Sequence, residues 1–235
     1  MPEGFAERRS DIMTRLGPGI PARGKIHTLA LNSLTLRFLV AVDVEGFSQR
    51  HAAEQAKAQD DLESAMAQAA ANVGLDRARW YRQPRGDGEL AVLPQGVNGL
   101  SLVADYPRKL ASSIAAINLA NGESRLRVRL AIHHGGVAPG RFGPVGTALV
   151  AISRLVDSEV ARQQLRQRSD LHITLIVSAT VYDEVIQSRL HDLNPEAFRR
   201  VTIRAKGISY TGYLYQENLG AQDCIIPAPR EPIIA

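Results

Sequence analysis

The sequence predicts a fold of the α/β (α+β) class. Helices are expected to cover one mixed sheet of split βαβ, ferredoxin-like type. Runs rich in Val, Ile and Leu alternate with longer runs rich in Ala and Leu, which predicts alternating strands and helices. The stretch "RGDG" at 85–88 interrupts this alternation with a tight hairpin, and a second hairpin closes the folded region. The expected order is β-α-β-β-α-β-α-β-α-β-β. Hairpins pair antiparallel and crossovers pair parallel, so the sheet must be mixed.

The chain has the size and composition of one globular domain with a substantial core. It contains 235 residues, of which 45% are hydrophobic and 22% are charged. Proline and glycine recur through residues 1–34, which predicts an irregular leader with a short helix over Phe5–Leu16. We expect the domain to cover 35–216 and a loose tail to cover 217–235.

The first half of the domain is predicted to hold a buried strand, a long helix and a hairpin. The stretch "LTLRFLVAVD" (34–43) is almost entirely apolar, as in a buried strand. Ala and Leu content predicts a helix over 48–74, with Ser48 as its N-cap and Gly74 at its end. Two short strands are expected on either side of the "RGDG" turn, at 77–84 and 89–94.

The second half is predicted to alternate helices and strands up to the closing hairpin. Arginines alternate with apolar residues in "SRLRVRLAIHHGGVAPG" (124–140), a pattern typical of a half-buried strand. Pro107 falls near the first turns, or at a break, of the preceding helix. The expected elements are helix 98–121, loop 141–146, helix 147–169, strand 171–178, helix 179–190 and hairpin 199–216.

Charge and cysteine content limit the class of protein. The net charge of +4 is mild and spread along the chain, which is weak evidence for nucleic acid and suits a pocket for a small anion equally well. Arg125, Arg127 and Arg129 share one strand face, which we expect to be solvated or at an interface. The single cysteine, Cys224, cannot form an internal disulfide, and no run is long enough to span a membrane. We therefore expect a cytoplasmic protein with no membrane or nucleic-acid partner.

Asp43 ends the first strand, where an unpaired carboxylate would be costly. It either caps the following turn or holds a cation. Asp87, on the next hairpin, should lie beside it, although Asp in a Gly-flanked turn is also a common turn former. Two carboxylates suit one or two Mn²⁺ or Mg²⁺ ions, and Gly46, Phe47 and Ser48 would offer backbone N–H groups to a phosphate. This combination predicts phosphoryl or nucleotidyl chemistry.

These motifs resemble those of the class III nucleotidyl cyclases, the catalytic domain of adenylate and guanylate cyclases. "DVEGFS" (43–48) resembles that family's Asp-Ile-x-Gly-Phe-Thr, and "GD" (86–87) resembles the Gly-Asp pair that carries its second metal residue. "RVRLAIHHGGVAPG" is similar to its Arg-Ile-Gly-Ile-His-x-Gly strand, and "VGTALVAISRLVDS" to its Gly-x-x-Val-Asn-x-Ala-x-Arg-Leu helix. "IRAKGIS" is similar to its late Lys-Gly segment, so the resemblance covers about residues 36–215.

The resemblance implies cyclisation of a nucleoside triphosphate, in which the 3′-hydroxyl attacks the α-phosphorus and pyrophosphate leaves. It implies two divalent ions, Mn²⁺ or Mg²⁺, held by Asp43, Asp87 and the carbonyl of Val44. Arg154 would stabilise the transition state and Lys206 would contact the triphosphate, both from the other chain of a head-to-tail homodimer. The plainer interpretation makes Arg154 and Lys206 ordinary surface charges.

Three positions depart from the family pattern. Gln83 stands where adenylate cyclases carry Lys and guanylate cyclases Glu, Gly143 falls near the second base-reading position, and Val150 replaces a transition-state Asn. An uncharged amide can read a pyrimidine edge, and in this the chain resembles the pyrimidine cyclases of bacterial Pycsar antiphage systems. That resemblance implies cyclic UMP or CMP synthesis, with UTP the expected substrate and a downstream effector that senses the product. The alternatives are an adenylate or guanylate cyclase with an unusual base pocket, and a degenerate cyclase-like regulatory module.

Two further pairs of residues carry expectations about burial. His133 and His134 are adjacent on one predicted strand, so they should face opposite sides. We expect one to be in the core or hydrogen-bonded and the other to be near an interface. Trp80 and Tyr81 are expected to be core or interface aromatics.

Overall fold

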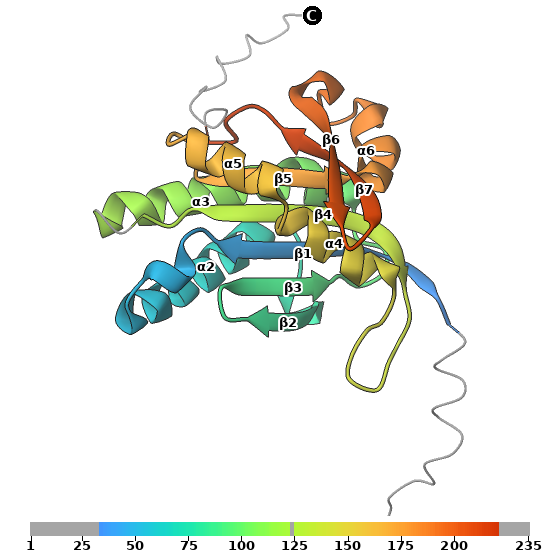
Figure 1. The fold of residues 1–235 in the computed structure, drawn as a ribbon, viewed down its shortest axis with the longest axis horizontal. Helices are drawn as coiled ribbons and strands as arrows, with labels where there is room; N and C mark the ends of the chain where they lie inside the picture. Colours follow the sequence, from blue (N-terminus) through green and yellow to red (C-terminus); the bar gives the residue numbers. More distant parts are fainter. Residues whose placement is uncertain (1–32, 123–124, 221–235) are drawn as a thin grey trace, which may run out of the picture.

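The computed structural model describes residues 33–122 and 125–220 as one mixed sheet with helices on both faces (Figure 1). The seven strands of these residues lie in the order β2-β3-β1-β4-β5-β7-β6. Their bounds are β1 Thr35–Val44, β2 Tyr81–Arg85, β3 Gly88–Val92, β4 Val128–Val137, β5 Ile173–Ser178, β6 Phe198–Ala205 and β7 Ile208–Tyr215. The predicted fold class and strand order along the chain are confirmed, whereas the leader helix and Cys224 lie outside the described residues.

Helices pack on both faces of the sheet. They are α2 Ala52–Asn72, α3 Tyr106–Asn121, α4 Thr147–Val156, α5 Glu159–Gln167 and α6 Ala179–Glu184. A π-helical turn, Ser101–Asp105, precedes α3, and Pro107 stands in the first turn of that helix as expected. Short 3₁₀ turns complete the fold at Phe47–Gln49, Arg77–Arg79, Ile186–Ser188 and Pro195–Ala197. None of the helices in the described part of the chain is long and apolar enough to cross a bilayer.

The central strand β1 separates two hydrophobic clusters. Val40 and Val42 pack into the cluster that includes α2 and α3, whereas Leu39 and Ala41 pack into the cluster that includes α4. This period-two alternation is that of a strand buried on both faces. Continuing it by two residues puts the side chain of Asp43 on the α4 face, between β3 and β4.

The N-terminus of the first long helix differs from the prediction. Ser48 does not cap it, because Gly46 adopts a left-handed φ of 65° and a 3₁₀ turn follows. The helix begins at Ala52 behind His51, whose backbone N–H donates to Glu54 Oε2 at 3.1 Å in a capping box. Residues 46–51 therefore form a separate turn between β1 and α2.

Two predicted helices are shorter than expected. The helix predicted over 147–169 is broken between α4 and α5, where Ser158 is extended with ψ of 141°. The helix predicted over 179–190 ends at Glu184, and a 3₁₀ turn replaces its last part. Both hairpins are confirmed, and Lys206 and Gly207 turn the second one with φ of 50° and 78°.

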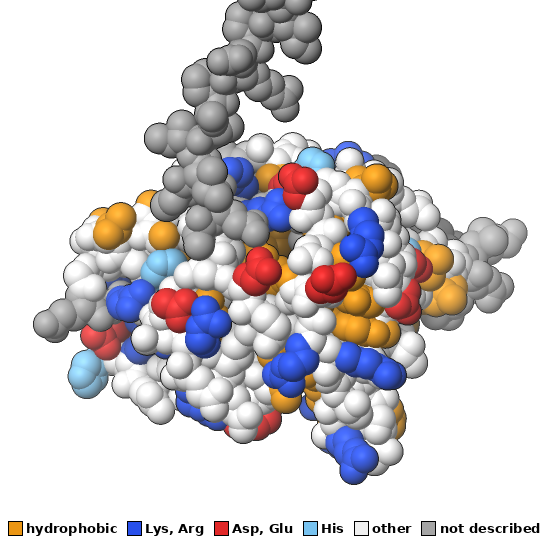
Figure 2. All heavy atoms as spheres, turned by 90° about the horizontal axis from the view of Figure 1, so that it is seen from above, with side chains coloured by type: hydrophobic (Ala, Val, Ile, Leu, Met, Phe, Trp, Pro, Cys, Tyr) orange, Lys and Arg blue, Asp and Glu red, His pale blue; other side chains and the backbone are white. Residues whose placement is uncertain are grey.

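The surface seen from above carries both signs of charge (Figure 2). Blue Lys and Arg side chains lie in several separate places among red Asp and Glu side chains. A nucleic-acid surface normally gathers its basic side chains on one face. The face in this view shows no such gathering of Lys and Arg side chains among the described residues.

Candidate active site

Asp43 is a buried carboxylate paired with an arginine. Its Cα partner on β4 is Arg129, whose Nη2 donates to Oδ2 at 2.8 Å and whose Nε lies 2.7 Å from Oδ1. Burial raises the pKa of Asp43 to about 6, although Arg129 acts in the opposite direction. The Asp43 side chain thus has an arginine of the same chain as its partner, and its role as a metal ligand stays a prediction. Arg129 is not solvated, because its side chain is only 11% exposed.

The residues predicted to hold a metal lie together. The Val44 N–H donates to the carbonyl of Asp87 at 2.8 Å, and the charge of Asp87 contributes to the raised pKa of Asp43. Oδ1 of Asp43 is buried and accepts no hydrogen bond from the described residues, although Arg129 Nε lies close to it. Those residues contain no cluster of three or more His, Cys, Asp or Glu. A divalent ion would thus rest on two carboxylates and the Val44 carbonyl, with phosphate or water oxygens completing its shell, as Mg²⁺ commonly does.

The turn after Val44 is shaped to accept an anion. Gly46 is left-handed, and the N–H groups of Gly46, Phe47 and Ser48 donate to no backbone carbonyl of the described residues. Successive unpaired N–H groups in such a turn form an anion-binding concavity. The predicted phosphate residues therefore do lie together, although in a turn separate from the start of α2.

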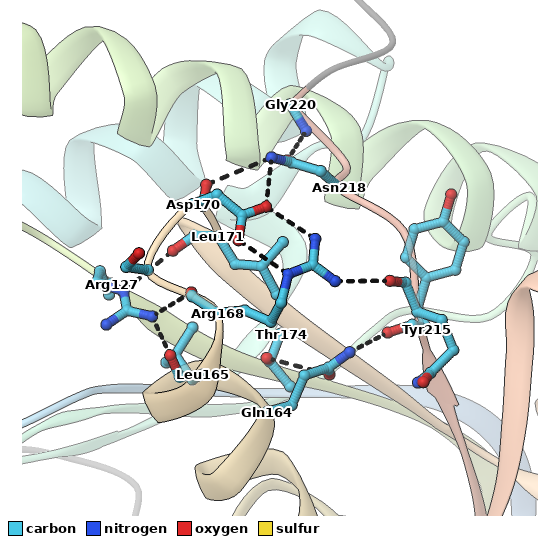
Figure 3. A network of polar contacts seen from close by, with 12 residues as sticks. Arg127, Gln164, Leu165, Arg168, Asp170, Leu171, Thr174, Tyr215, Asn218 and Gly220 are labelled. Atoms are coloured by element: carbon cyan, nitrogen blue, oxygen red, sulfur yellow. Dashed lines mark hydrogen bonds and ion pairs between the residues drawn. The ribbon is translucent and has the colours of Figure 1, made fainter.

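Arg127 holds this turn to the rest of the domain. Its guanidinium donates to the carbonyls of Leu165 in the last turn of α5 and of Arg168 and Leu171 after it (Figure 3). The same side chain pairs with Glu45 at 2.9 Å, and the Glu45 N–H donates to the Arg127 carbonyl. A cation at a helix C-terminus satisfies carbonyls that have no partner within the helix. Arg127 therefore fixes the turn relative to β4 and α5.

An open cleft of about 570 Å³ adjoins the turn. Gly46 and Arg129 line it, and so do four more arginines and three other side chains, which are Arg50, Arg125, Arg162, Arg166, Glu45, Gln49 and Glu54. Arg162 and Arg166 also pair with acidic residues of the α4–α5 region. Several guanidinium groups around exposed backbone N–H groups suit a polyphosphate.

A second cavity of about 470 Å³ gathers the predicted base and transition-state residues. Gln83, Val150 and Arg154 line it, and Arg154 pairs with no side chain of the described residues. Arg85 Nη2 donates to Ser153 Oγ at 3.0 Å, which ties the hairpin to α4. The cavity lies on the same face as Asp43. Asp157 connects the two regions, because it lines this cavity and its charge also raises the pKa of Asp43.

Some expected contacts are not made within this chain. Lys206 is exposed at the tip of the β6–β7 hairpin and lines neither cavity. Gly143 lies against Tyr81, since a Cβ there would come within 2.1 Å of the Tyr81 hydroxyl. Trp80 is a core residue, as expected, and packs 5.9 Å from Tyr106.

A buried ion network anchors the hairpin that carries Gln83 and Asp87. Arg77 is 8% exposed and donates to both Glu89 oxygens, at 2.8 and 3.2 Å, and to Glu63 on α2. Burial disfavours the charge of Arg77, but the hydrogen bonds and charge of Glu89 and the hydrogen bond with Glu63 together raise the pKa of Arg77. The sequence analysis did not predict this network, although "RAR" (77–79) stands just before the hairpin and Glu89 stands just after its turn.

The two histidines of β4 face opposite sides, as predicted. His134 stacks on Phe38 with ring centroids 4.5 Å apart, and its Nδ1 lies 2.6 Å from Glu184. His133 has a buried Nδ1 with no partner in the described part of the chain. Burial, with a smaller contribution from His134, lowers the pKa of His133 to about 4. His133 is therefore a neutral side chain at neutral pH.

No protein-family model matches this chain, and no curated protein matches it by sequence. Solved structures do match its fold. The guanylyl cyclase Cya2 has a TM-score of 0.55 at 15% identity, over 78% of this chain and 92% of that one. An adenylate/guanylate cyclase/hydrolase from Silicibacter pomeroyi has a TM-score of 0.54 at 15% identity, over 78% and 97% of the two chains. The guanylate cyclase domain of RhGC from Catenaria anguillulae, in complex with GTP, has a TM-score of 0.52 at 17% identity, over 78% and 97%. The chain has the fold of class III adenylate and guanylate cyclase catalytic domains.

Proposed function

We propose that this chain is a nucleotide cyclase, which converts a pyrimidine nucleoside triphosphate into a 3′,5′-cyclic monophosphate and pyrophosphate, with UTP the expected substrate. The observation that carries the proposal is the meeting of Asp43, Val44 and Asp87 beside a turn of unpaired N–H groups. Two carboxylates next to an anion site are the parts that metal-assisted phosphoryl chemistry needs. The cyclase fold of the chain makes cyclisation the reaction of that class that we favour.

The residues divide the work by their chemistry. Asp43, Asp87 and the Val44 carbonyl would hold Mn²⁺ or Mg²⁺, which supply activation of the 3′-hydroxyl and neutralise phosphoryl charge. The N–H groups of Gly46, Phe47 and Ser48 and the arginine-lined cleft would orient the triphosphate and the leaving pyrophosphate. Arg154 has no competing partner in the described residues, so it is available to the charge that develops at the α-phosphate. We assign Lys206 to the triphosphate as well, on the motif alone.

We further propose that two chains share each site in a head-to-tail homodimer. Asp43 and Arg154 lie on the same face of the sheet, and that region leaves large apolar side chains exposed: Phe142 at 96%, Val145 at 50% and Val150 at 48%. Exposed apolar patches of this kind mark interfaces. Asp87→Ala and Arg154→Ala chains would each be inactive alone. An equal mixture should recover about a quarter of wild-type activity, because half of the dimers then contain one intact site. Full inactivity of the mixture would contradict shared sites.

The pyrimidine assignment rests on Gln83 and its surroundings. The cavity that holds Gln83 offers an amide in place of a charged reader, and an amide can donate to and accept from a pyrimidine edge. Tyr81 fills the space beside Gly143, so a carboxylate could enter there only if Tyr81 moved. These features favour a small base without a charged contact.

The test is to incubate the purified chain with Mn²⁺ and each of ATP, GTP, CTP and UTP, and to identify products by mass spectrometry. A cyclic monophosphate from UTP or CTP alone would support the proposal, and Gln83→Ala should then reduce kcat/KM for that substrate. A product from ATP or GTP would retain the cyclase and replace the pyrimidine assignment with the adenylate or guanylate alternative. Turnover that Asp87→Ala abolishes would eliminate the regulatory-module alternative, which Val150 motivates.

The biological role follows from the product. We propose that a cytoplasmic pyrimidine cyclase of this kind makes a second messenger in bacterial antiphage defence, with a cyclic-nucleotide-sensing effector as its downstream partner. Phage infection of cells that carry the chain should raise cyclic UMP or cyclic CMP, measured by mass spectrometry of extracts. An Asp87→Ala strain is the matched control and should show no rise.

A further inference from the structure

The proposed metal position already contains a positive group. Both oxygens of Asp43 face the guanidinium of Arg129, at 2.8 and 2.7 Å, and the Asp43 side chain is only 9% exposed. A buried carboxylate needs a counter-charge, and in this structure Arg129 provides it. A divalent ion on Oδ1 would lie within a few ångströms of that guanidinium, and like charges at such a distance repel strongly.

The contact with Oδ1 is the weaker half of the pair. Nε of Arg129 and Oδ1 of Asp43 are close, yet neither atom has a hydrogen bond in the described residues. The other half, from Nη2 to Oδ2, does meet hydrogen-bond geometry. Oδ1, the oxygen that an ion would approach, is therefore paired with Arg129 by charge attraction alone. A divalent ion can supply that positive charge in place of the guanidinium.

A displaced guanidinium would have a place to go. Arg129 already lines the arginine-rich cleft of about 570 Å³ beside the Gly46 turn, so a change of side-chain rotamer brings it further into that cleft. Inside the cleft it would add one positive charge for a polyphosphate. Metal binding at Asp43 would thus strengthen anion binding, and by linkage the anion would strengthen metal binding equally.

We propose that Arg129 is a resident counter-ion of Asp43, which a divalent ion displaces and which then serves the anion cleft. The inference rests on the proposed function only for the identity of the metal site. It assigns Arg129 the task of keeping Asp43 charged and closed until metal arrives. If Arg129 were instead a fixed structural partner of Asp43, its presence would increase the metal affinity of the site or leave that affinity unchanged.

Two arginines just before β4 show why Arg129 is the exchangeable residue. Arg127 is held by Glu45 and by three carbonyls in the last turn of α5 and the loop after it (Figure 3), so its displacement would break several contacts. Arg125 lines the same cleft, but its guanidinium contacts the carbonyl of Ser169 at 3.5 Å rather than Asp43. Arg125→Gln is therefore a charge-matched control, which changes the field of the cleft without touching the pair.

The experiment measures Mn²⁺ affinity of the nucleotide-free protein by electron paramagnetic resonance of free Mn²⁺. Arg129→Gln should bind Mn²⁺ about tenfold or more tightly than wild type, since the competitor is gone, whereas Arg125→Gln should change the affinity by less than about threefold. Arg129→Lys keeps the charge but loses the planar guanidinium that can contact both carboxylate oxygens. Its Mn²⁺ affinity should therefore fall between those of wild type and Arg129→Gln. This variant keeps the test decisive if Arg129→Gln does not fold.

Each outcome separates the inference from the proposed function. Weaker or unchanged Mn²⁺ binding in both Arg129 variants would overturn the inference, and so would equal gains in Arg129→Gln and Arg125→Gln. If Asp43→Asn binds Mn²⁺ as tightly as wild type, the ion is elsewhere, and the proposed metal site itself is wrong. A second readout is thermal: Mn²⁺ should raise the Tm of Arg129→Gln more than that of wild type.

Discussion

Replacement of Arg77 by leucine tests how the Asp87 hairpin is anchored. The substitution removes both hydrogen bonds to Glu89 and the contact with Glu63, and leaves Glu89 with Arg82 Nη1 at 3.7 Å as its remaining cation in the described residues. Because Arg77 and Glu89 are both only 8% exposed, Glu89 would be left as a buried, poorly paired carboxylate. Breaking a buried pair in this way typically costs about 3–5 kcal/mol of unfolding free energy.

A second contribution comes from Trp80, whose ring lies 5.5 Å from the Arg77 guanidinium carbon. Loss of this cation–π contact adds about 0.5–1 kcal/mol. We therefore expect the total loss of unfolding free energy to lie in the upper part of the range of about 3–5 kcal/mol given for the buried pair. The chain has a single tryptophan, so fluorescence of Trp80 during urea unfolding reports directly on this site. The free energy of unfolding from that curve is the quantity to compare with wild type.

The double variant Arg77→Leu with Glu89→Leu is the control. Two apolar side chains of similar volume leave no buried charge, so most of the lost stability should return. A loss below about 1 kcal/mol in Arg77→Leu would refute the reasoning, because that is the value expected of a surface ion pair. A double variant no more stable than Arg77→Leu would refute it as well, since the penalty would then not come from Glu89.

Three other substitutions test separate parts of the structure. Arg154→Ala should lower kcat by about 100- to 1,000-fold with little change in Tm, measured by product formation and thermal melting, and a KM effect alone would contradict its transition-state role. Gly88→Ala should destabilise the hairpin and lower the urea midpoint, because its Cβ would lie 1.9 Å from the Val42 carbonyl oxygen, and an unchanged midpoint would contradict that clash. The folded-state pKa of His133 is about 4 against 6.5 for the ordinary residue, so the unfolded chain binds the proton more readily as pH falls below about 6.5. Up to about 3 kcal/mol should then be lost by pH 4, and His133→Leu should flatten that part of the urea-midpoint profile, whereas an identical profile would assign the pH dependence to other groups.

The strands were predictable because each is specified by its own residues. The apolar run ending at Asp43 and the "RGDG" turn are local signals, and both elements formed where expected. The helix boundaries were less predictable. Ser48 has a good capping side chain, but the left-handed Gly46 begins a turn that moves the helix start to Ala52. The break at Ser158 has no proline or glycine to announce it, and the two helices on either side of it, α4 and α5, both pack against β4 and β5.

The sequence motifs predicted which residues gather at the site, but not which side chains pair with them. The motif placed Asp43 and Asp87 together, and the sheet register agrees, because Asp43 pairs with Gly88. The partner of Asp43 was not foreseen, since Arg129 lies 86 residues away along the chain and only the pairing of β1 with β4 makes them neighbours. Alternation alone showed that Arg129 shared a face with other arginines, without showing that this face met a buried carboxylate.

The two outer strands of the sheet have a consequence for behaviour at high concentration. Every residue of β2 is exposed, and Pro84 within it has no N–H to offer to a further strand. The other edge, β6, exposes Arg199, Arg200 and Arg204. Charged or proline-bearing edges oppose the edge-to-edge growth that leads to fibrils. Concentrated solutions should therefore resist ordered aggregation. Contacts between copies of the chain are then favoured at the faces of the sheet over its edge strands.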